Sequence, residues 1–457
     1  MKLLASAVVA ASSVNAVHFE ETGRLPAGMI AFDICMSNNQ VGTIPVIING
    51  VGGHIRRTDD GGASSRPVVS DTMIVPMRCA YGSDENKGMM GGLMMVEGAP
   101  MQYTETAGEV FEAVDTNDKP RKMFLEVAPE VTPIPGTNGE GFVFAREAIG
   151  LGVRRGIYIT RDGGKTFKII RGPKEMKDTA ARAVAQLDAN TLIVAYGGFP
   201  TNERVDTEGL VDEGIVHIPV SERVVVNTSF NAGAAAVSID ATADAARPLT
   251  HESTGDLPIP GTYWTRIYKS TDGGETFDLV FASDNDVYPM QMACPSARFC
   301  FVALEGAGNR VILRTENACN SFEYAYEDRG FMGINAISCS SPDNCFSVGT
   351  GADDSGRFSL GSVLHSNDVG RTWTEVGNLE NRHFFGVSAV SDTAVYGVAK
   401  SSNADISYVY KLVTDEDSDD STEHRQDFSD EHVAKLRRMC QQGKGKRFIC
   451  QYLFGQQ

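Results

Sequence analysis

The chain of 457 residues has little positive charge and no long apolar run. Its 41 lysines and arginines face 59 aspartates and glutamates, which gives a formal net charge of −18. Because a protein this acidic repels phosphate backbones, we expect no nucleic-acid partner. No apolar run reaches the roughly 18 residues that a membrane-spanning helix needs, so we also predict no membrane span.

Common catalytic signatures are absent from the sequence as well. It contains no Gly-x-Ser-x-Gly elbow, no His-Glu-x-x-His pair, no Walker loop and no dinucleotide fingerprint. The eight histidines are scattered along the chain. The methionine-rich segment 88–101 is better explained by buried strand positions than by soft-metal ligands. We therefore expect neither a cofactor nor a resident metal.

Residues 1–16, MKLLASAVVAASSVNA, combine a lysine, an apolar stretch and small residues. This pattern predicts a signal peptide cleaved after Ala16, and therefore a protein that is secreted or lies in the endomembrane lumen. In such an oxidising compartment the nine cysteines can form disulfides, and the odd count leaves at least one over. The sequon at Asn227 predicts a glycosylated surface position.

One octapeptide pattern, Ser/Thr-x-Asp-x-Gly-x-Thr-aromatic, is repeated along the chain. Good copies stand at 160–167, 270–277 and 366–373, and degenerate copies at 58–64, 104–111 and 315–322. Apart from one long gap after the copy at 160–167, the copies recur about every 50 residues. Short strands with alternating apolar residues flank each copy, so the pattern predicts the four-stranded blades of a β-propeller.

We interpret the octapeptide as a lock for a hairpin rather than as a catalytic site. Asp272 is placed to accept hydrogen bonds from the backbone of its own turn, and the following glycines supply the backbone angles. The terminal aromatic is expected to be buried under the turn. The residues expected to form these locks are Asp60, Asp162, Gly164, Thr166, Phe167, Asp272, Gly274, Thr276, Phe277, Asn317, Asp368, Gly370, Thr372 and Trp373.

These copies resemble the Asp-box, or bacterial-neuraminidase repeat. It occurs in sialidases, sortilin-type receptors, some xyloglucan-active glycosidases and photosystem II assembly-factor propellers. The resemblance covers roughly residues 28–413 and implies an all-β propeller in which the repeat is scaffold. The blades at 294–322 and 339–373 share a Cys-x5-Cys segment that leads into a strand. They look closest in style to assembly-factor and secreted sialidase-like or sortilin-like propellers.

Six copies and a box-less repeat at 382–413 favour seven blades, with six as the alternative. Because a closed ring has no exposed sheet edge, we expect a strand near Met29–Cys35 to complete the last repeat. The propeller is predicted to span 17–413. An insertion at 198–262 is either a binding excursion or a dangling loop, and the segment 214–230 within it is the place where an extra blade would fit.

The composition changes after the propeller. The segment 414–427 is an acidic linker, and 428–457 is predicted to be a short helical basic tail. Short spacing predicts three disulfides, and a fourth pairing, Cys35–Cys79, is less constrained. The three are Cys294–Cys300, Cys339–Cys345 and Cys440–Cys450. Cys319 lies inside an octapeptide and is expected to be the unpaired thiol.

The resemblance leaves two classes of function open. Sialidases clamp a substrate carboxylate with three arginines and use a Tyr–Glu nucleophilic pair and an aspartate acid/base. Only Arg24, in Gly-Arg-Leu-Pro, partly matches the motif of the first arginine, and the sequence does not select among Arg266, Arg298 and Arg310. We therefore expect a non-catalytic scaffold that binds a protein or glycan through a propeller face or the insertion. The alternative is an exo-acting, sialidase-type glycoside hydrolase.

Overall fold

The computed structural model describes most of the predicted propeller. The described residues are 17–48, 52–68, 74–94, 101–114, 122–148, 156–176, 179, 181–198, 263–284, 287–306, 309–329, 331–352 and 358–414. The predicted signal peptide, the insertion beyond Gly198, the acidic linker beyond its first residue and the basic tail lie outside them, together with Asn227, Cys440 and Cys450. One compact unit, His18–Leu412, contains the sheets.

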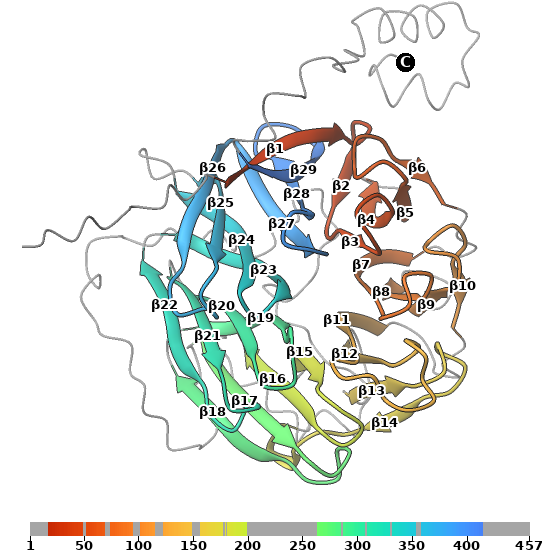
Figure 1. Ribbon diagram of the computed structural model, residues 1–457, viewed down its shortest axis with the longest axis vertical. Coiled ribbons are helices and arrows are strands. Elements are labelled where there is room, and N and C mark those ends of the chain that lie inside the picture. Colours follow the sequence, from red (N-terminus) through yellow and green to blue (C-terminus); the bar gives the residue numbers. More distant parts are fainter. Residues whose placement is uncertain are drawn as a thin grey trace, which may run out of the picture. The chain divides into compact units, whose positions relative to one another are not determined.

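Antiparallel four-stranded units form a β-propeller of seven blades, which confirms the predicted fold (Figure 1). Blade 1 contains β2 (Met29–Ala31), β3 (Cys35–Met36), β4 (Gly42–Ile48), β5 (Gly52–Thr58) and β6 (Arg66–Pro67). Blade 2 contains β7 (Ile74–Tyr81), β8 (Gly88–Met94), β9 (Met101–Thr104) and β10 (Glu112–Ala113). Blade 3 contains β11 (Lys122–Pro129), β12 (Phe142–Ala148), β13 (Gly156–Thr160) and β14 (Lys168–Ile170).

The remaining blades follow in chain order. Blade 4 contains β15 (Ala181–Gln186), β16 (Leu192–Gly198), β17 (Trp264–Ser270) and β18 (Asp278–Asp284). Blade 5 contains β19 (Val287–Ala293), β20 (Cys300–Gly306), β21 (Asn309–Thr315) and β22 (Glu323–Arg329). Blade 6 contains β23 (Phe331–Ser341), β24 (Asn344–Ala352), β25 (Phe358–Ser366) and β26 (Thr374–Glu380). Blade 7 contains β27 (Arg382–Ala389), β28 (Val395–Ser401), β29 (Ser407–Thr414) and β1 (Val17–Arg24).

The first strand of each blade lies nearest the centre of the ring, and the fourth lies at the rim (Figure 1). The turn from first to second strand and the turn from third to fourth strand lie on the same face. In blade 4, for example, Gly273 N donates to Asn190 O at 2.8 Å. We call this the lower face, and the opposite face, where the inner strands begin, the upper face.

Helix contributes almost nothing to the described part of the chain. Its one helical element is the 3₁₀ turn η1 (Lys174–Met176), which connects blades 3 and 4. Among the described residues no helix is long and apolar enough to cross a membrane.

The ring closes through β1, and the predicted closure through Met29–Cys35 is wrong. Strands β2 and β3 of that segment both pair with β4 inside blade 1. Their links to blade 7 are an isolated bridge from Met29 to Ile406 and hydrogen bonds to side chains, such as Ala31 N to Ser407 Oγ at 3.0 Å. The strand that pairs with β29 is β1, Val17–Arg24. The segment 29–36 is apolar because an inner strand is buried, whereas a closing rim strand needs little apolar surface.

This closure also explains why the last repeat has no octapeptide. In six blades the octapeptide joins the third strand to the fourth along the chain. In blade 7 the third strand, β29, is C-terminal and the fourth, β1, is N-terminal. The two strands are not consecutive in the chain, so no turn joins them directly.

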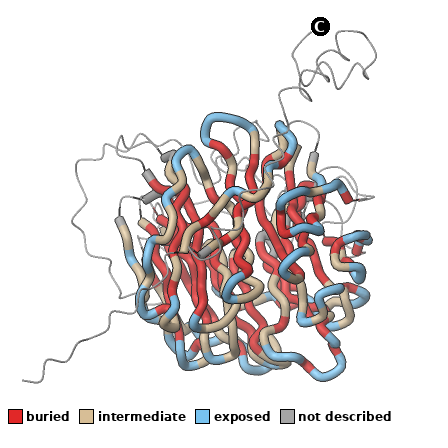
Figure 2. The backbone as a smooth tube through the Cα atoms, turned by 45° about the horizontal axis from the view of Figure 1, so that its top comes forward, coloured by how far each residue is buried: buried red, intermediate tan, exposed pale blue. Residues whose placement is uncertain are grey.

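The core lies between neighbouring blades. Each of its clusters combines residues of two adjacent blades, such as Met89 of blade 2 with Phe124 and Phe144 of blade 3. Between blades 6 and 7, Phe19 of β1 meets Phe346 and Phe384 edge-on, with ring centroids 6.4 and 6.0 Å apart. Buried strands run through the ring, and exposed residues gather at the turns (Figure 2).

The octapeptides form turns that their own side chains close by hydrogen bonds. In the copy at 270–277, Asp272 Oδ1 accepts hydrogen bonds from Ser270 Oγ and Thr276 N, and Gly274 N donates to Ser270 Oγ. The Thr276 hydroxyl also donates a hydrogen bond to Asp272 Oδ2. This bond, followed by those from Thr276 N and Ser270 Oγ, holds the pKa of Asp272 far below its usual range. In the copy at 315–322 the amide of Asn317 accepts the same bonds. An amide oxygen therefore replaces the carboxylate as acceptor in this lock.

The fifth residue of each octapeptide packs against the preceding blade. Gly274 has φ +89°, and a Cβ there would lie 2.4 Å from Ile170 Cδ1 of blade 3. In blade 5 the position is held by Cys319, which has φ +59° and is buried against the core shared with blade 4. The half-buried aromatics Phe277 and Trp373 end their octapeptides. Each packs against the core cluster that its own blade shares with the preceding blade. The octapeptide therefore holds its blade against the preceding blade, in addition to joining two strands of its own blade.

Cations before three octapeptides extend this contact to the following blade. Each donates to the carbonyl oxygen of the fourth residue of the next octapeptide: Arg57 Nη1 to Ala107 O (2.7 Å), Lys269 Nζ to Ala318 O (2.7 Å) and Arg314 Nη1 to Val369 O (3.0 Å). Charged donors strengthen such hydrogen bonds, so these contacts stabilise the lower rim at three of the seven blade boundaries.

Gly274→Ala is expected to lower the free energy of unfolding by about 2–4 kcal/mol, because it combines strain at positive φ with a clash against Ile170. Gly273→Ala is the matched control. It also has a positive φ (+75°), but its nearest neighbour to an added Cβ is Lys168 Nζ at 3.6 Å. For Gly273→Ala we expect the free energy of unfolding to fall by only about 1–2 kcal/mol. Urea unfolding of both variants checks this, and equal losses would contradict packing between blades.

Phe19→Ala is expected to cost about 3–5 kcal/mol, because it empties a buried site between blades 6 and 7. Glu21→Ala on the same strand is the control. It removes only a surface ion pair with Arg382, 3.7 Å between Nη2 and Oε2, and should cost less than about 1 kcal/mol. Thermal and urea unfolding measure both. Closure through β1 would be refuted if Phe19→Ala were as stable as Glu21→Ala.

Candidate functional site at the ring axis

Local irregularities in the inner strands place polar side chains near the axis. The register of β7 shifts just before Arg78, that of β11 just before Glu126 and that of β19 just before Gln291. A β-bulge re-aims the side chains that follow it. In blade 1 the inner strand is broken between β2 and β3, and Asp33 lies in that break.

These four residues and Asn335 of β23 form a network, the axial cluster, in which Asp33, Glu126 and Asn335 are buried and Arg78 and Gln291 are partly buried. Arg78 donates to Phe32 O of blade 1 and to Asn335 O of blade 6, both at 3.4 Å. Its Nη1 also lies 4.0 Å from Asp33 Oδ2. The arginine therefore joins three blades across the centre of the ring.

Gln291 makes a second set of contacts between blades. Its Oε1 accepts a hydrogen bond from Ile337 N of blade 6 at 2.8 Å. Its Nε2 donates to Glu126 Oε1 of blade 3 at 3.5 Å. The other carboxylate oxygen of Glu126 is buried and has no hydrogen-bond partner among the described residues. A buried polar atom of this kind needs a polar neighbour such as a bound water.

Burial dominates the electrostatics of the two carboxyl groups. It raises the pKa of Glu126 to about 8, although the charge of Arg78 acts in the opposite direction. The pKa of Asp33 is raised to about 6 by burial, again against the charge of Arg78 and hydrogen bonds from Ile34 N and Cys79 N. Burial therefore favours the neutral form of both carboxyl groups, and more strongly for Glu126 than for Asp33.

A second polar group, the upper-face cluster, lies where blades 4 and 5 meet. Tyr288 of β19 donates its hydroxyl to Glu305 of β20, and both side chains are buried. The guanidinium of Arg182 lies 4.9 Å from the Tyr288 ring centroid, and Tyr263 stacks on that ring at 5.6 Å. Burial raises the pKa of Glu305 to about 8 against the charge of Arg182.

The insertion begins and ends beside the upper-face cluster. Gly198 is the last described residue before it, and Tyr263 is the first after it. The backbone just before the insertion also positions Arg182 of this cluster, because Gly197 O accepts a hydrogen bond from Arg182 Nε at 3.1 Å.

The structure places the arginines that were considered for a carboxylate clamp on blades 4, 5 and 7. Arg24 ends the rim strand β1 and donates to the Tyr408 hydroxyl at 2.8 Å. Arg266 of β17 pairs with Asp284 at 2.8 Å, and Arg310 of β21 pairs with Asp328 at 2.9 Å. Arg298 of the turn from β19 to β20 donates to Glu316 O at 2.9 Å. Each is held by partners of its own, which for Arg310 include Ser362 and Glu375 of blade 6, and the contacts above bring no two of the arginines together.

Three disulfides lie within the described residues. The predicted pairs Cys294–Cys300 and Cys339–Cys345 each join a first and a second strand across one turn. Cys35–Cys79 joins β3 of blade 1 to β7 of blade 2. Cys319 is free and buried. Disulfides persist in oxidising environments, so these bridges indicate a secreted or luminal protein.

Sequence reasoning missed both clusters, although one signal was present. Three inner strands read VPMRCA (75–80), MFLEVA (123–128) and YPMQMA (288–293). When they are aligned, each has a polar residue at its fourth position inside an otherwise apolar strand. That residue is Arg78, Glu126 or Gln291.

No protein-family model and no curated protein matches the chain. Similar solved structures include YCF48 bound to a D1 peptide, with 12% identity, a TM-score of 0.48 and coverage of 88% of this chain and 96% of that one. YCF48 from Cyanidioschyzon merolae has 12% identity, a TM-score of 0.45 and coverage of 86% and 98%. The Niastella koreensis GH74 enzyme has 11% identity, a TM-score of 0.35 and coverage of 81% and 62%.

At 11–12% identity the likeness concerns the fold alone.

Glu126→Gln is expected to remove a pH dependence of stability. The folded-state pKa of Glu126, about 8, lies above its ordinary value of 4.5. Protonated Glu126 therefore contributes stability that is complete below about pH 4.5 and is lost as the pH rises through 8, by up to about 1.4 kcal/mol per pH unit. In urea unfolding, the free energy of unfolding of the variant should rise relative to that of the wild type as the pH increases from 5 to 9. The exposed Glu275→Gln is the control, and parallel curves for all three proteins would contradict this account.

Proposed function

We propose that the protein is a non-catalytic propeller scaffold of a secreted or luminal compartment that binds a protein or glycan on its upper face. The observation that carries the proposal is the surroundings of the Tyr288–Glu305 pair. The guanidinium of Arg182 and the stacked ring of Tyr263 lie against Tyr288. A pair covered in this way is suited to holding structure rather than to attacking a sugar.

The positions of the other arginines support the same proposal. A carboxylate clamp needs several guanidinium groups that converge on one point. Arg266 and Arg310 lie on third strands of blades 4 and 5, with carboxylates as their partners, and Arg24 lies on the rim of blade 7. Moving any of them to the axis would break an ion pair or hydrogen bond already formed. For the buried Arg266 and Arg310 that loss costs several kcal/mol, on the order of 3–5.

Side chains on the upper face have the chemistry of a recognition surface. Tyrosine and arginine are enriched where proteins bind partners, since they combine a large apolar body with polar groups. Arg182 and Tyr263 supply such a surface at blades 4 and 5, where they lie against the buried Tyr288. At blade 7, the guanidinium groups of Arg24 and Arg382 lie 5.0 and 4.0 Å from the ring centroid of Tyr408.

A sialidase-type glycosidase is the second candidate, and the Tyr288–Glu305 hydrogen bond is the observation that favours it. A glutamate with raised pKa beside a tyrosine hydroxyl is the kind of pair that retaining sialidases use as nucleophile. In this reading Arg182 would be the first arm of the clamp. The two functions differ in a single measurable property, the turnover of a sialoside.

The purified mature protein is expected to release no fluorophore from a fluorogenic sialoside above a boiled control. In panning of a peptide-display library and a glycan array, it should select ligands that an upper-face variant, Arg182→Ala/Tyr263→Ala, binds at least about 10-fold more weakly, the loss of one or two interface anchors.

Lys165→Ala, an exposed change on the lower face, is the binding control and should leave affinity unchanged. Sialoside hydrolysis that disappears in Tyr288→Phe or Arg24→Ala would overturn the scaffold proposal and support the glycosidase. Ligands that bind the upper-face variant and the wild type equally would refute the assignment of the binding face.

A further inference from the structure

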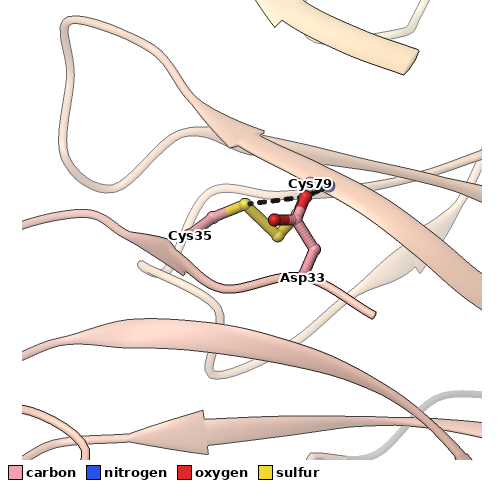
Figure 3. A group of neighbouring side chains, drawn as sticks. All are labelled: Asp33, Cys35 and Cys79. Atoms are coloured by element: carbon pink, nitrogen blue, oxygen red, sulfur yellow. Dashed lines mark hydrogen bonds between the residues drawn. A yellow bond between two sulfur atoms is a disulfide. The ribbon is translucent and has the colours of Figure 1, made fainter. Parts of the chain in front are cut away.

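We propose that Asp33, Cys35 and Cys79 form a Zn²⁺ site when the Cys35–Cys79 disulfide is reduced. The disulfide form and the zinc form would then be two alternative ways of joining blades 1 and 2. Figure 3 shows the carboxylate of Asp33 lying beside the two sulfur atoms. This inference concerns the ring axis and does not depend on the proposed scaffold function.

The distances fit a zinc site with little rearrangement. One oxygen of Asp33 and the two sulfur atoms lie within 4.8 Å of one another, and Cys35 Sγ is 3.8 Å from Asp33 Oδ2. Tetrahedral zinc, with bonds of about 2.3 Å to sulfur and 2.0 Å to oxygen, places sulfur and oxygen about 3.5 Å apart. Only the two sulfur atoms must separate, to about 3.8 Å. Since their Cα atoms are 5.9 Å apart, side-chain rotation can provide this movement.

Two thiolates and one carboxylate are a ligand set that selects zinc over calcium or magnesium, which prefer oxygen ligands. Three protein ligands leave the fourth position of the tetrahedron for a water molecule. Glu126, whose pKa responds to the charges of both Asp33 and Arg78, belongs to the same axial cluster and has a buried oxygen without a described partner. That oxygen needs a further polar species, such as a water molecule, within the axial cluster.

The charge of the axial cluster stays balanced in both states. In the disulfide form the carboxylate of Asp33 is offset by Arg78, whose Nη1 is 4.0 Å away. In the zinc form two thiolates and the carboxylate carry three negative charges against the two of Zn²⁺, and Arg78 again offsets the remaining one. A buried site needs such compensation, because an unpaired charge in this setting is costly.

The position of this pair separates it from the other two disulfides. Cys294–Cys300 and Cys339–Cys345 each lie within one hairpin, six residues apart, and neither belongs to a described group of potential metal ligands. Cys35–Cys79 spans two blades beside a buried carboxylate. When it opens, the contact between blades 1 and 2 loses its covalent link, and zinc would restore a bond between them.

The chemical steps balance as follows. A dithiol reductant transfers two electrons and two protons to the disulfide, which becomes two thiols while the reductant becomes a disulfide. Zn²⁺ then binds both sulfur atoms and displaces the two thiol protons to solvent. Reoxidation reverses the sequence and releases the metal. The zinc form is therefore expected before the disulfide is first formed, or after a dithiol has reduced it.

The test uses the full chain, reduced anaerobically with a phosphine, which takes up oxygen from one water to give the phosphine oxide. Zinc retained after gel filtration is measured by mass spectrometry, and zinc affinity by competition with a chromogenic chelator. The reduced wild type should retain one more Zn²⁺ per chain than Cys35→Ser/Cys79→Ser. Asp33→Asn should bind that zinc at least about 10-fold more weakly, as expected for a weakened ligand set.

Cys339→Ser/Cys345→Ser is the matched control, which removes a cysteine pair of the same protein but keeps the proposed ligands. It should retain the extra zinc. Cobalt substitution gives a second readout, since thiolate-to-cobalt absorption should appear in the wild type and the control and be lost in Cys35→Ser/Cys79→Ser. If that variant does not fold, Asp33→Asn, which keeps both cysteines, still decides the matter. Equal zinc content and affinity in the wild type and Asp33→Asn would overturn the proposal.

Discussion

Closure of the ring by β1 is the constraint on which the rest of the structure depends. Seven blades pack side by side, and each blade contributes one face to the core shared with the preceding blade and the other face to the core shared with the following blade. Such an arrangement is satisfied everywhere only if the last blade also has a complete sheet and a neighbour on each side. Strand β1 supplies both, because it completes the sheet of blade 7 and places Phe19 against blade 6. The N-terminal and C-terminal ends of the propeller thus share one sheet.

Packing between blades and the chemistry of the axis are consequences of this closed ring. The octapeptide locks hold the lower rim, and their fifth residues and aromatics bury surface against the preceding blade. The inner strands then have fixed places around the axis, so single polar residues from blades 1, 2, 3, 5 and 6 meet there. The site is therefore a product of the whole ring, because no blade contains it alone.

The sequence predicted what is local and missed what is assembled. Asp272 and its equivalents predict a turn because all their hydrogen bonds lie within eight residues. The copies, together with the last repeat that lacks one, therefore predicted the blades and their number. Strand β1, VHFEETGR, has one fully buried apolar residue, Phe19, and so carries little signal for its role. Asp33, Arg78 and Glu126 are far apart in the chain, and only the bulges and the ring bring them together. The missing seventh octapeptide was a usable sign of closure, because it marks the blade whose outer strand comes from the other end of the chain.

The most direct test of this account is hydrogen exchange along β29, measured by mass spectrometry on the full propeller and on a chain that starts at residue 25. If β1 closes the ring, the amides of β29 should exchange as slowly as those of β25, the corresponding third strand of blade 6, since both are paired on two sides. They should lose this protection in the shortened chain, while β19–β22 of blade 5 keep theirs. Fast exchange of β29 in the full propeller, or unchanged protection in the shortened chain, would contradict closure through β1.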